Sequence, residues 1–206
     1  MIREHGREIG FLEDYRKRIN PELMNRLLYR SVPVLEHTKW EISKVDFGFC
    51  ETVLPLNQET TNQHGTHQAA LISLSADYTG GMALTTVLTG VPLSGIHQCQ
   101  PEEAASLWLA SMNVKYLKPS TGHLTAQCSI DKKTIKRIRA RYFSEKRVLV
   151  ALPITFVSNG NVVAEAELKY FAQPTIQLLS PGKNRSALFT QKLKACLLYT
   201  SPSPRD

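Results

Sequence analysis

Long apolar runs are missing from this sequence of 206 residues. A membrane-spanning helix needs about 20 consecutive apolar residues, and no segment approaches that length. The first residues, MIREHGREIGFLEDYRKR, are charged where a signal peptide would be apolar. We therefore predict a soluble, cytoplasmic protein without a membrane span.

Cysteine is scarce, and its spacing forms no binding motif. The four cysteines are far apart and none belongs to a CxxC pair: Cys50, Cys99, Cys128 and Cys196. This spacing argues against a structural zinc site and against a disulfide framework. Reduced thiols are the expected state.

Two motifs of common hydrolases are also missing. Ser73 and Ser75 lack the glycine context of a nucleophile elbow, which disfavours a serine hydrolase. His64 and His67 lie close together, but the Asp and Cys residues that would complete a metal site are distant. We expect neither a metal nor a cofactor.

The chain does hold enough apolar residues, 42%, for one sizeable core. An apolar helical pattern that can run to Leu88 precedes segments in which apolar residues alternate with polar ones. One alternating face is expected to hold Trp108, Ala110, Met112, Val114 and Tyr116. The expected fold is α+β, an antiparallel sheet of five or six strands around one long central helix, with strands near 39–46, 49–56, 108–116, 124–130, 148–156 and 162–170.

The segment before this domain is expected to be helical and accessory. A short helix is expected at 12–19 and a second at 21–30, and Pro33 is expected to end that segment. We therefore divide the chain into N-terminal helices (1–38), a central domain (39–173) and a C-terminal extension (174–206).

The last eleven residues, CLLYTSPSPRD, differ in character from everything before them. With permissible codons they back-translate into a sequence that resembles a transposase adapter used to prepare sequencing libraries. We interpret 196–206 as an adapter artefact. The alternative is an ordinary disordered tail rich in proline and serine.

Positive charge is concentrated between Asp131 and Arg147, where eight Lys or Arg residues stand against two acids. The simplest interpretation is a solvated amphipathic helix with Ile135, Ile138 and Tyr142 facing inward. The functional interpretation is a landing site for coenzyme A phosphates or for an acidic acyl-carrier protein. Nucleic acid is not expected, because the stretch carries only two aromatic residues and no recognised binding motif.

The most informative segment is 62–81, NQHGTHQAALISLSADYTGG. Small polar residues lead into the central helix, whose first N–H groups are unpaired and attract an anion such as a developing oxyanion. A lone carboxylate, Asp77, follows within the apolar pattern. Because an unpaired buried charge is costly, this carboxylate needs a partner or a chemical role.

The spacing along this helix suggests how the two features act together. Four residues share one helical face at i, i+4, i+7 and i+11: Thr66, Ala70, Ser73 and Asp77. The first and last are ~16 Å apart along the axis, too far to act on one carbonyl. We therefore predict a symmetric dimer in which Asp77 of one subunit approaches the helix start of the other.

The order of these elements resembles the hotdog-fold thioesterases, closest to the phenylacetyl-CoA thioesterase-like group and its uncharacterised relatives. The resemblance covers residues 40–173 and leaves out an insert at 97–103. It is carried by Asn62, the His64-Gly65-Thr66 turn, Asp77 followed by Gly80 and Gly81, and the strand Met112-Asn113-Val114-Lys115-Tyr116-Leu117-Lys118-Pro119.

The resemblance implies the roles of the site residues. An Asn before the helix positions water or substrate, a His-Gly-Gly at the helix start polarises the thioester carbonyl, and an acid nine residues after that His acts from the partner subunit. These roles fall on Asn62, on Gln68 with Ala69, and on Asp77, although this chain has Gln-Ala-Ala in place of His-Gly-Gly. The expected substrate contacts are His64, Gly65, Thr66, His67 and Ser73.

The resemblance implies hydrolysis of acyl-CoA or acyl-carrier-protein thioesters by a homodimer or homotetramer, within lipid metabolism. A hotdog protein that binds acyl-CoA without hydrolysing it is the alternative, because the Gln68-Ala69-Ala70 segment departs from the family pattern. A hotdog dehydratase is a third possibility, disfavoured because no Asp and His pair has hydratase-like spacing.

Overall fold

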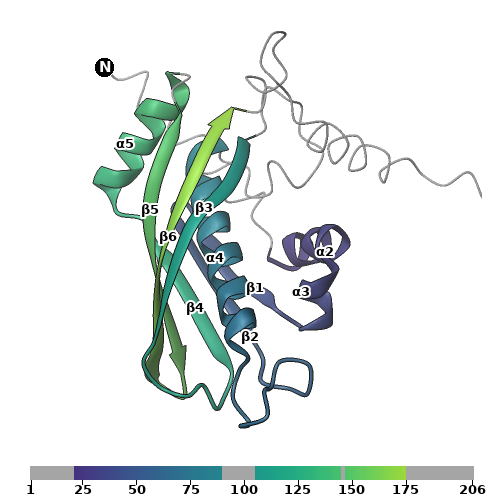
Figure 1. The fold of residues 1–206 in the computed structure, drawn as a ribbon. Coiled ribbons are helices and arrows are strands. Elements are labelled where there is room, and N and C mark those ends of the chain that lie inside the picture. The colour runs from purple at the N-terminus through teal and green to yellow at the C-terminus, as the bar shows by residue number, and fades with distance from the viewer. Residues whose placement is uncertain (1–20, 90–104, 145–146, 175–206) are drawn as a thin grey trace, which may run out of the picture.

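A computed structural model of the protein describes residues 21–89, 105–144 and 147–174. Six strands form one antiparallel sheet in the order β1-β2-β4-β5-β6-β3 (Figure 1). The elements along the chain are α2 (Pro21–Ser31), α3 (Pro33–His37), β1 (Glu41–Asp46), β2 (Phe49–Leu54), α4 (Ala69–Thr89), β3 (Ala105–Tyr116), β4 (Leu124–Ser129), α5 (Lys132–Phe143), β5 (Val148–Ser158) and β6 (Asn161–Pro174). No helix in these ranges has the length and apolar character needed to cross a membrane.

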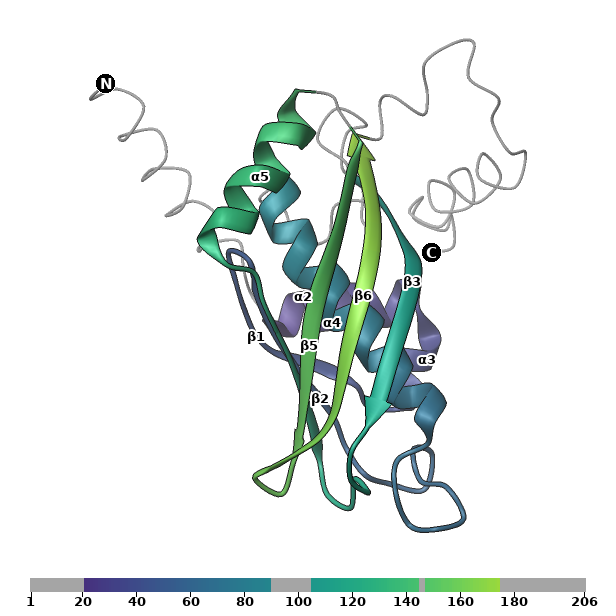
Figure 2. The ribbon, with the colours of Figure 1, turned by 60° about the vertical axis from the view of Figure 1, so that its left-hand side comes forward.

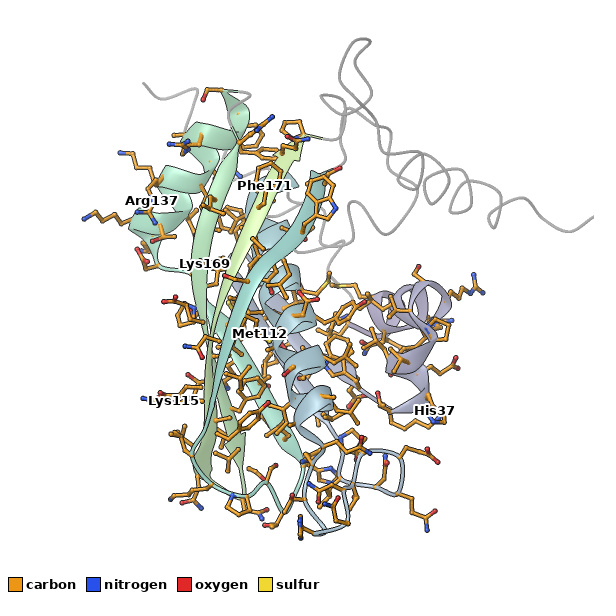
Figure 3. The ribbon with its side chains drawn as sticks, in the orientation of Figure 1. His37, Met112, Lys115, Arg137, Lys169 and Phe171 are labelled. Atoms are coloured by element: carbon orange, nitrogen blue, oxygen red, sulfur yellow. The ribbon has the colours of Figure 1, made fainter. Side chains whose placement is uncertain are left out.

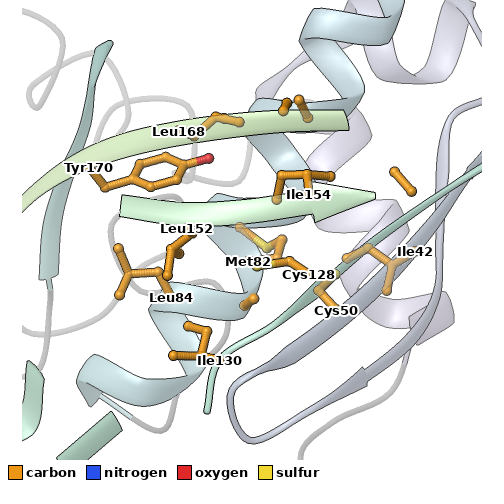
Figure 4. Packing of buried hydrophobic residues seen from close by; sticks show 14 of the residues in the cluster. Ile42, Cys50, Met82, Leu84, Cys128, Ile130, Leu152, Ile154, Leu168 and Tyr170 are labelled. Atoms are coloured by element: carbon orange, nitrogen blue, oxygen red, sulfur yellow. The ribbon is translucent and has the colours of Figure 1, made fainter. Parts of the chain in front are cut away.

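The sheet curves around α4, which explains why this helix is apolar on almost every side (Figure 1). All of residues 79–88 are buried, and inward side chains of the strands pack around them (Figure 4). The buried hydroxyl groups of α4 are satisfied internally, because buried polar groups need hydrogen-bond partners. Thr79 bonds Thr52 of β2 at 2.7 Å, and Thr86 accepts from the main-chain N–H of Gly48 at 2.8 Å.

The helices α2 and α3 complete the core beside β1. Met24, Leu28 and Leu35 are buried and belong to the same apolar cluster as the sheet. The side chain of Asn25 bonds both the N–H and the carbonyl of Ile42, at 2.8 and 3.1 Å. This amide therefore occupies the outer edge of β1 as a neighbouring strand would.

Two cysteines face each other across β2 and β4. Cys50 and Cys128 are register partners, and both are buried free thiols (Figure 4). Burial raises the pKa of both, that of Cys128 to about 12, so neither is present as a reactive thiolate near neutral pH. Cys99 and Cys196 lie outside the described residues.

The predicted α+β class, the long central helix and the six antiparallel strands are confirmed. Strands β5 and β6 form a hairpin, and its turn residues Asn159 and Gly160 have φ of 49° and 73°. Positive φ at both positions is typical of the two-residue turn that matches strand twist. The expected helix at 12–19, the insert at 97–103 and the tail at 196–206 fall outside the described residues.

One local prediction is incomplete and another is wrong. Helix α2 ends at Ser31, before Pro33, as predicted, but Pro33 then begins helix α3, because proline at the first helical position loses no hydrogen bond. Trp108 and Ala110 do not share the inward face of Met112, because a β-bulge between Leu109 and Ser111 shifts the alternation of β3. The partly buried side chains of β3 are therefore Leu107, Leu109, Met112 and Val114.

Gly80 allows α4 and β6 to approach closely. A Cβ atom built on Gly80 would lie 2.6 Å from the hydroxyl oxygen of Tyr170, whose ring is rigid and fully buried. A Cβ atom on Gly81 would meet only the side chain of Leu107, at 3.6 Å, which is an ordinary contact. The two adjacent glycines therefore have different roles.

We predict that Gly80→Ala lowers the free energy of unfolding by about 1–3 kcal/mol, because the new methyl group must displace Tyr170. The matched variant Gly81→Ala gains helix propensity without a clash and is expected to be neutral or to stabilise by about 0.5–1 kcal/mol. Urea denaturation of both variants measures this difference. Equal stability of the two variants would contradict the packing described for Gly80.

Candidate functional site

The loop before α4 is held in shape by Asn62. Its side-chain oxygen accepts from the main-chain N–H groups of His64 (2.9 Å) and Thr66 (3.2 Å). Its amide group donates to the hydroxyl of Thr66 at 2.9 Å and to the carbonyl of His67 at 3.3 Å. Both the oxygen and the NH2 group of the Asn62 side chain are therefore engaged within the loop. These contacts support a role for Asn62 in ordering the loop.

Thr66 lies in this loop, and the prediction that it shares the helical face of Asp77 is wrong. The helix begins three residues later, at Ala69, because Thr66 is bonded to Asn62 through both its N–H and its hydroxyl group. The other three predicted members of the face, Ala70, Ser73 and Asp77, do lie on α4. His64 and Gly65 are exposed at the tip of the loop.

His67 joins the loop to the connection between β3 and β4. Its imidazole Nδ1 lies 2.8 Å from the hydroxyl oxygen of Ser120, and its N–H donates to the Ser120 carbonyl at 3.2 Å. His67 is only 4% exposed, and its Nε2 is buried without a hydrogen-bond partner among the described residues. Burial lowers the pKa of His67, opposed by the nearby carbonyls of Pro55, Leu54 and Ser120.

Gln68 leads directly into the first turn of α4. Its carbonyl accepts from the N–H groups of Leu71 and Ile72, and its side-chain amide donates to the carbonyls of Glu59 and Thr61. The N–H groups of Ala69 and Ala70 have no acceptor among the described residues, and both residues are exposed. The first turn therefore presents two open donors at the positive end of the helix dipole.

Asp77 lies in the middle of α4, where the sheet does not fully enclose the helix. It is half-buried, and burial raises the pKa of its carboxyl group. The neighbouring hydroxyl of Tyr170 partly opposes this shift while it donates to the Asp77 main-chain carbonyl at 2.7 Å. None of the ion pairs formed within the described ranges involves Asp77.

Asp77 belongs to a half-open stripe of α4, which we define as Ala70, Ser73, Leu74 and Asp77. These residues follow the spacing i, i+3, i+4 and i+7, so they share one face of the helix. All four are exposed or half-exposed, whereas α4 is buried throughout 79–88. The half-open stripe is thus a largely apolar surface of α4 that carries one carboxylate, Asp77. This carboxylate lies at the end of the stripe nearer to the buried half of the helix.

Tyr116, at the end of β3, borders this stripe. Its hydroxyl donates to the Ala69 carbonyl at 3.2 Å and lies 3.4 Å from the hydroxyl oxygen of Ser73. Further along β3, Met112 turns toward α4 (Figure 3). Neither Tyr116 nor Tyr170 was a predicted site residue, because only the folded strands bring their hydroxyl groups to α4.

The open donors and the carboxylate are too far apart within one chain to act together. Ala69 and Asp77 are separated by eight positions of α4, or ~12 Å along the helix axis. A carbonyl group that accepts from the Ala69 N–H cannot also contact Asp77 of the same subunit. The described residues contain no group of His, Cys, Asp and Glu side chains that could hold a metal ion.

We predict that acidification weakens the protein through His67. Its pKa in the folded state lies below the ordinary value of 6.5, so the folded state disfavours the protonated ring. The free energy of unfolding is therefore expected to fall as the pH drops below 6.5 toward the folded-state pKa. Urea denaturation of His67→Gln at several pH values should show a smaller loss over this window.

His64→Gln is the matched control for this experiment, because His64 is an exposed histidine of the same loop. It is expected to retain the full pH dependence of the unmodified protein. If His67→Gln and His64→Gln respond to pH in the same way, the buried imidazole is not the titrating group.

Comparison with known structures shows the same architecture in several proteins. The structure is similar to that of thioesterase HI1161 from Haemophilus influenzae (14% identity, TM-score 0.56), covering 80% of this chain and 96% of that one. The mutant thioesterase PA1618 from Pseudomonas aeruginosa is 12% identical (TM-score 0.55), with 76% and 95% covered. The protein of unknown function PA5026 from Pseudomonas aeruginosa is 15% identical (TM-score 0.59), with 75% and 95% covered.

These similarities show the hotdog fold, as the sequence resemblance predicted. No curated protein matches the sequence. A family model does match, over residues 20–171, and its description is "Domain of unknown function (DUF4442)". The match includes α2, α3 and all of the sheet except the last three residues of β6, so the chain belongs to the DUF4442 family.

Proposed function

We propose that the protein is a thioesterase that hydrolyses acyl-CoA or acyl-carrier-protein thioesters at two composite sites of a dimer, alone or within a tetramer. The observation that carries the proposal is the half-open stripe, where a carboxylate that forms no ion pair with the described residues lies on the same helix as a first turn with open donors. We place this activity in the cytoplasm and in lipid metabolism. The hotdog fold of the thioesterases HI1161 and PA1618 is consistent with it.

Each site would join the Ala69 N–H of one subunit to Asp77 of the other. The N–H group donates to the thioester carbonyl and stabilises the oxyanion that forms during attack. The Asp77 carboxylate takes a proton from water as the water oxygen bonds to the carbonyl carbon. When the C–S bond breaks, this proton passes to the leaving thiolate, and the acid and the free thiol are released.

The raised pKa of Asp77 suits this role, because a base is more effective when its pKa lies nearer to the working pH. The apolar stripe around Asp77 also needs a cover, since exposed apolar surface favours burial. An antiparallel second copy of α4 would cover the stripe and bring each Asp77 toward the opposite helix start. Ser73 and Tyr116 would then line the substrate entrance, with His64 and Gly65 at its rim.

A non-catalytic acyl-CoA-binding protein remains the second candidate function. The observation that favours it is Gln68, whose side chain is bonded to two loop carbonyls and does not point to the open donors. A binding protein would retain acyl-CoA on a column without releasing free thiol. A thiol-release assay on a panel of acyl-CoAs separates the two functions.

We predict that Asp77→Asn and Ala69→Pro each reduce thiol release strongly and leave the fold intact. Asparagine removes the base, and proline at the first helical position removes only an open N–H group. Loss of one oxyanion donor costs about 100 to 1000-fold in rate. Ala69→Gly retains the N–H group and serves as the matched control, with activity expected near that of the unmodified protein.

Mixing the two inactive variants tests whether the site is composite. In a mixed dimer, one site combines the intact Ala69 of one subunit with the intact Asp77 of the other. Random subunit exchange is therefore expected to restore about a quarter of the full activity. A mixture as inactive as its parents would rule out sites shared between subunits, because sites within single chains cannot be rebuilt by exchange.

We also predict that Tyr170→Phe moves the acidic limb of the pH profile of kcat/KM to higher pH. The Asp77 carboxylate must be deprotonated to act as base, so activity falls as the pH drops through its pKa. Because the Tyr170 hydroxyl lowers this pKa, its removal should raise it further above the ordinary value of 3.8. Tyr142→Phe changes a buried tyrosine of α5 and should leave the limb unchanged.

A further inference from the structure

The helix α5 occupies the place of a strand beside β5. The strand β4 pairs only with residues 155–158 of β5, whereas β6 pairs along its whole length. The helix α5 follows β4 and lies beside the unpaired half of β5, in front of the end of α4 (Figure 2). The outward faces of α5 and of the sheet therefore form one continuous surface.

The outward face of α5 is entirely basic or small. Ile138 and Tyr142 are buried, and the opposite side of the helix exposes Lys133, Lys136, Arg137 and Ala140. The helix holds six Lys or Arg residues and no acidic residue. Arg137 extends away from the body of the protein (Figure 3).

Large apolar side chains lie on both flanks of this basic face. On one flank, Phe143 is 59% exposed and has the guanidinium of Arg139 over its ring, 4.8 Å from the centroid. On the other flank, Leu149 of β5 is 68% exposed and is the register partner of Phe171 on β6. These are the two most exposed of the large apolar side chains in the described ranges.

Further cations connect the basic face to the second apolar flank. The guanidinium of Arg141 donates from Nε to the main-chain carbonyl of Arg147 at 3.3 Å, so α5 and the start of β5 are in contact. Lys169 follows on the outer face of β6, two residues before Phe171 (Figure 3). Among the described residues, the acidic side chains near this surface are Asp131, which caps the start of α5, and Glu165 and Glu167, which lie further along β6, opposite Thr155 and Pro153.

We propose that this surface, defined by Lys133, Lys136, Arg137, Phe143, Arg147 and Leu149, docks the protein on an anionic lipid bilayer. Cations attract the negatively charged head groups, while the flanking apolar side chains enter the boundary with the acyl chains. The apolar face of α5 packs in the core of the protein and cannot face the lipid. The helix therefore docks on the bilayer as part of a rigid surface and does not insert into it. The surface extends over both α5 and the sheet. A bilayer is continuous in its plane and can contact all of this surface at once, which favours a bilayer over a protein. This inference does not depend on thioester hydrolysis.

Sedimentation of the full chain with lipid vesicles tests the proposal. The protein is expected to sediment with phosphatidylcholine vesicles that contain phosphatidylserine, to do so less as salt is added, and to remain in solution with phosphatidylcholine alone. The triple variant Lys133→Gln/Lys136→Gln/Arg137→Gln should bind about 100-fold more weakly, since each cation near an anionic surface contributes about fivefold. Leu149→Ser should weaken binding even at low salt.

The matched control is the triple variant Arg26→Gln/Arg30→Gln/Lys118→Gln, which removes three exposed cations far from this surface. It changes the net charge equally and should retain vesicle binding, and thermal melts show whether every variant is folded. Equal weakening of the two triple variants would overturn the proposal, because only net charge would then matter. Capture by an immobilised acyl-carrier protein without any vesicle binding would also overturn it and assign the surface to an acidic protein.

Discussion

Enclosure of one helix by one curved sheet is the constraint on which this structure depends. Because α4 contacts strands on almost every side, its sequence must be apolar or small, and its buried threonines must find partners in the sheet, in the turn between β1 and β2 or in the helix itself. A charged residue can be accommodated only where the enclosure is incomplete. Asp77 occupies such a place, where it is still half-buried, and this burial raises the pKa of its carboxyl group. The packing of the core and the chemistry of the site therefore have one origin.

The sequence predicted the architecture well because periodicity and turn residues are local signals. Alternation along β5 and β6 and the Asn159-Gly160 turn specified the hairpin, and the apolar run after Gln68 specified the central helix. Prediction was wrong where a single residue altered the pattern. The bulge in β3 moved Trp108 to the outer face, and its neighbours in sequence contain no marker for that insertion.

The candidate site was less predictable, because its geometry depends on contacts between distant segments. The pattern identified Asp77 and the helix start, yet the burial of His67 depends on Ser120, which is 53 positions away. Tyr170 reaches Asp77 only because Gly80 lets β6 approach α4. The loop role of Asn62 likewise follows from four hydrogen bonds that a sequence pattern cannot distinguish from contacts with substrate.

The side chain of Asn25 has a consequence for assembly. By bonding the N–H and the carbonyl of Ile42, it occupies backbone groups that an incoming strand would need in order to pair with β1. A second copy of the chain would have to displace this amide before its own edge strand could add there. One short side chain therefore disfavours growth of the sheet at this edge and, with it, the repeated strand addition that builds fibres.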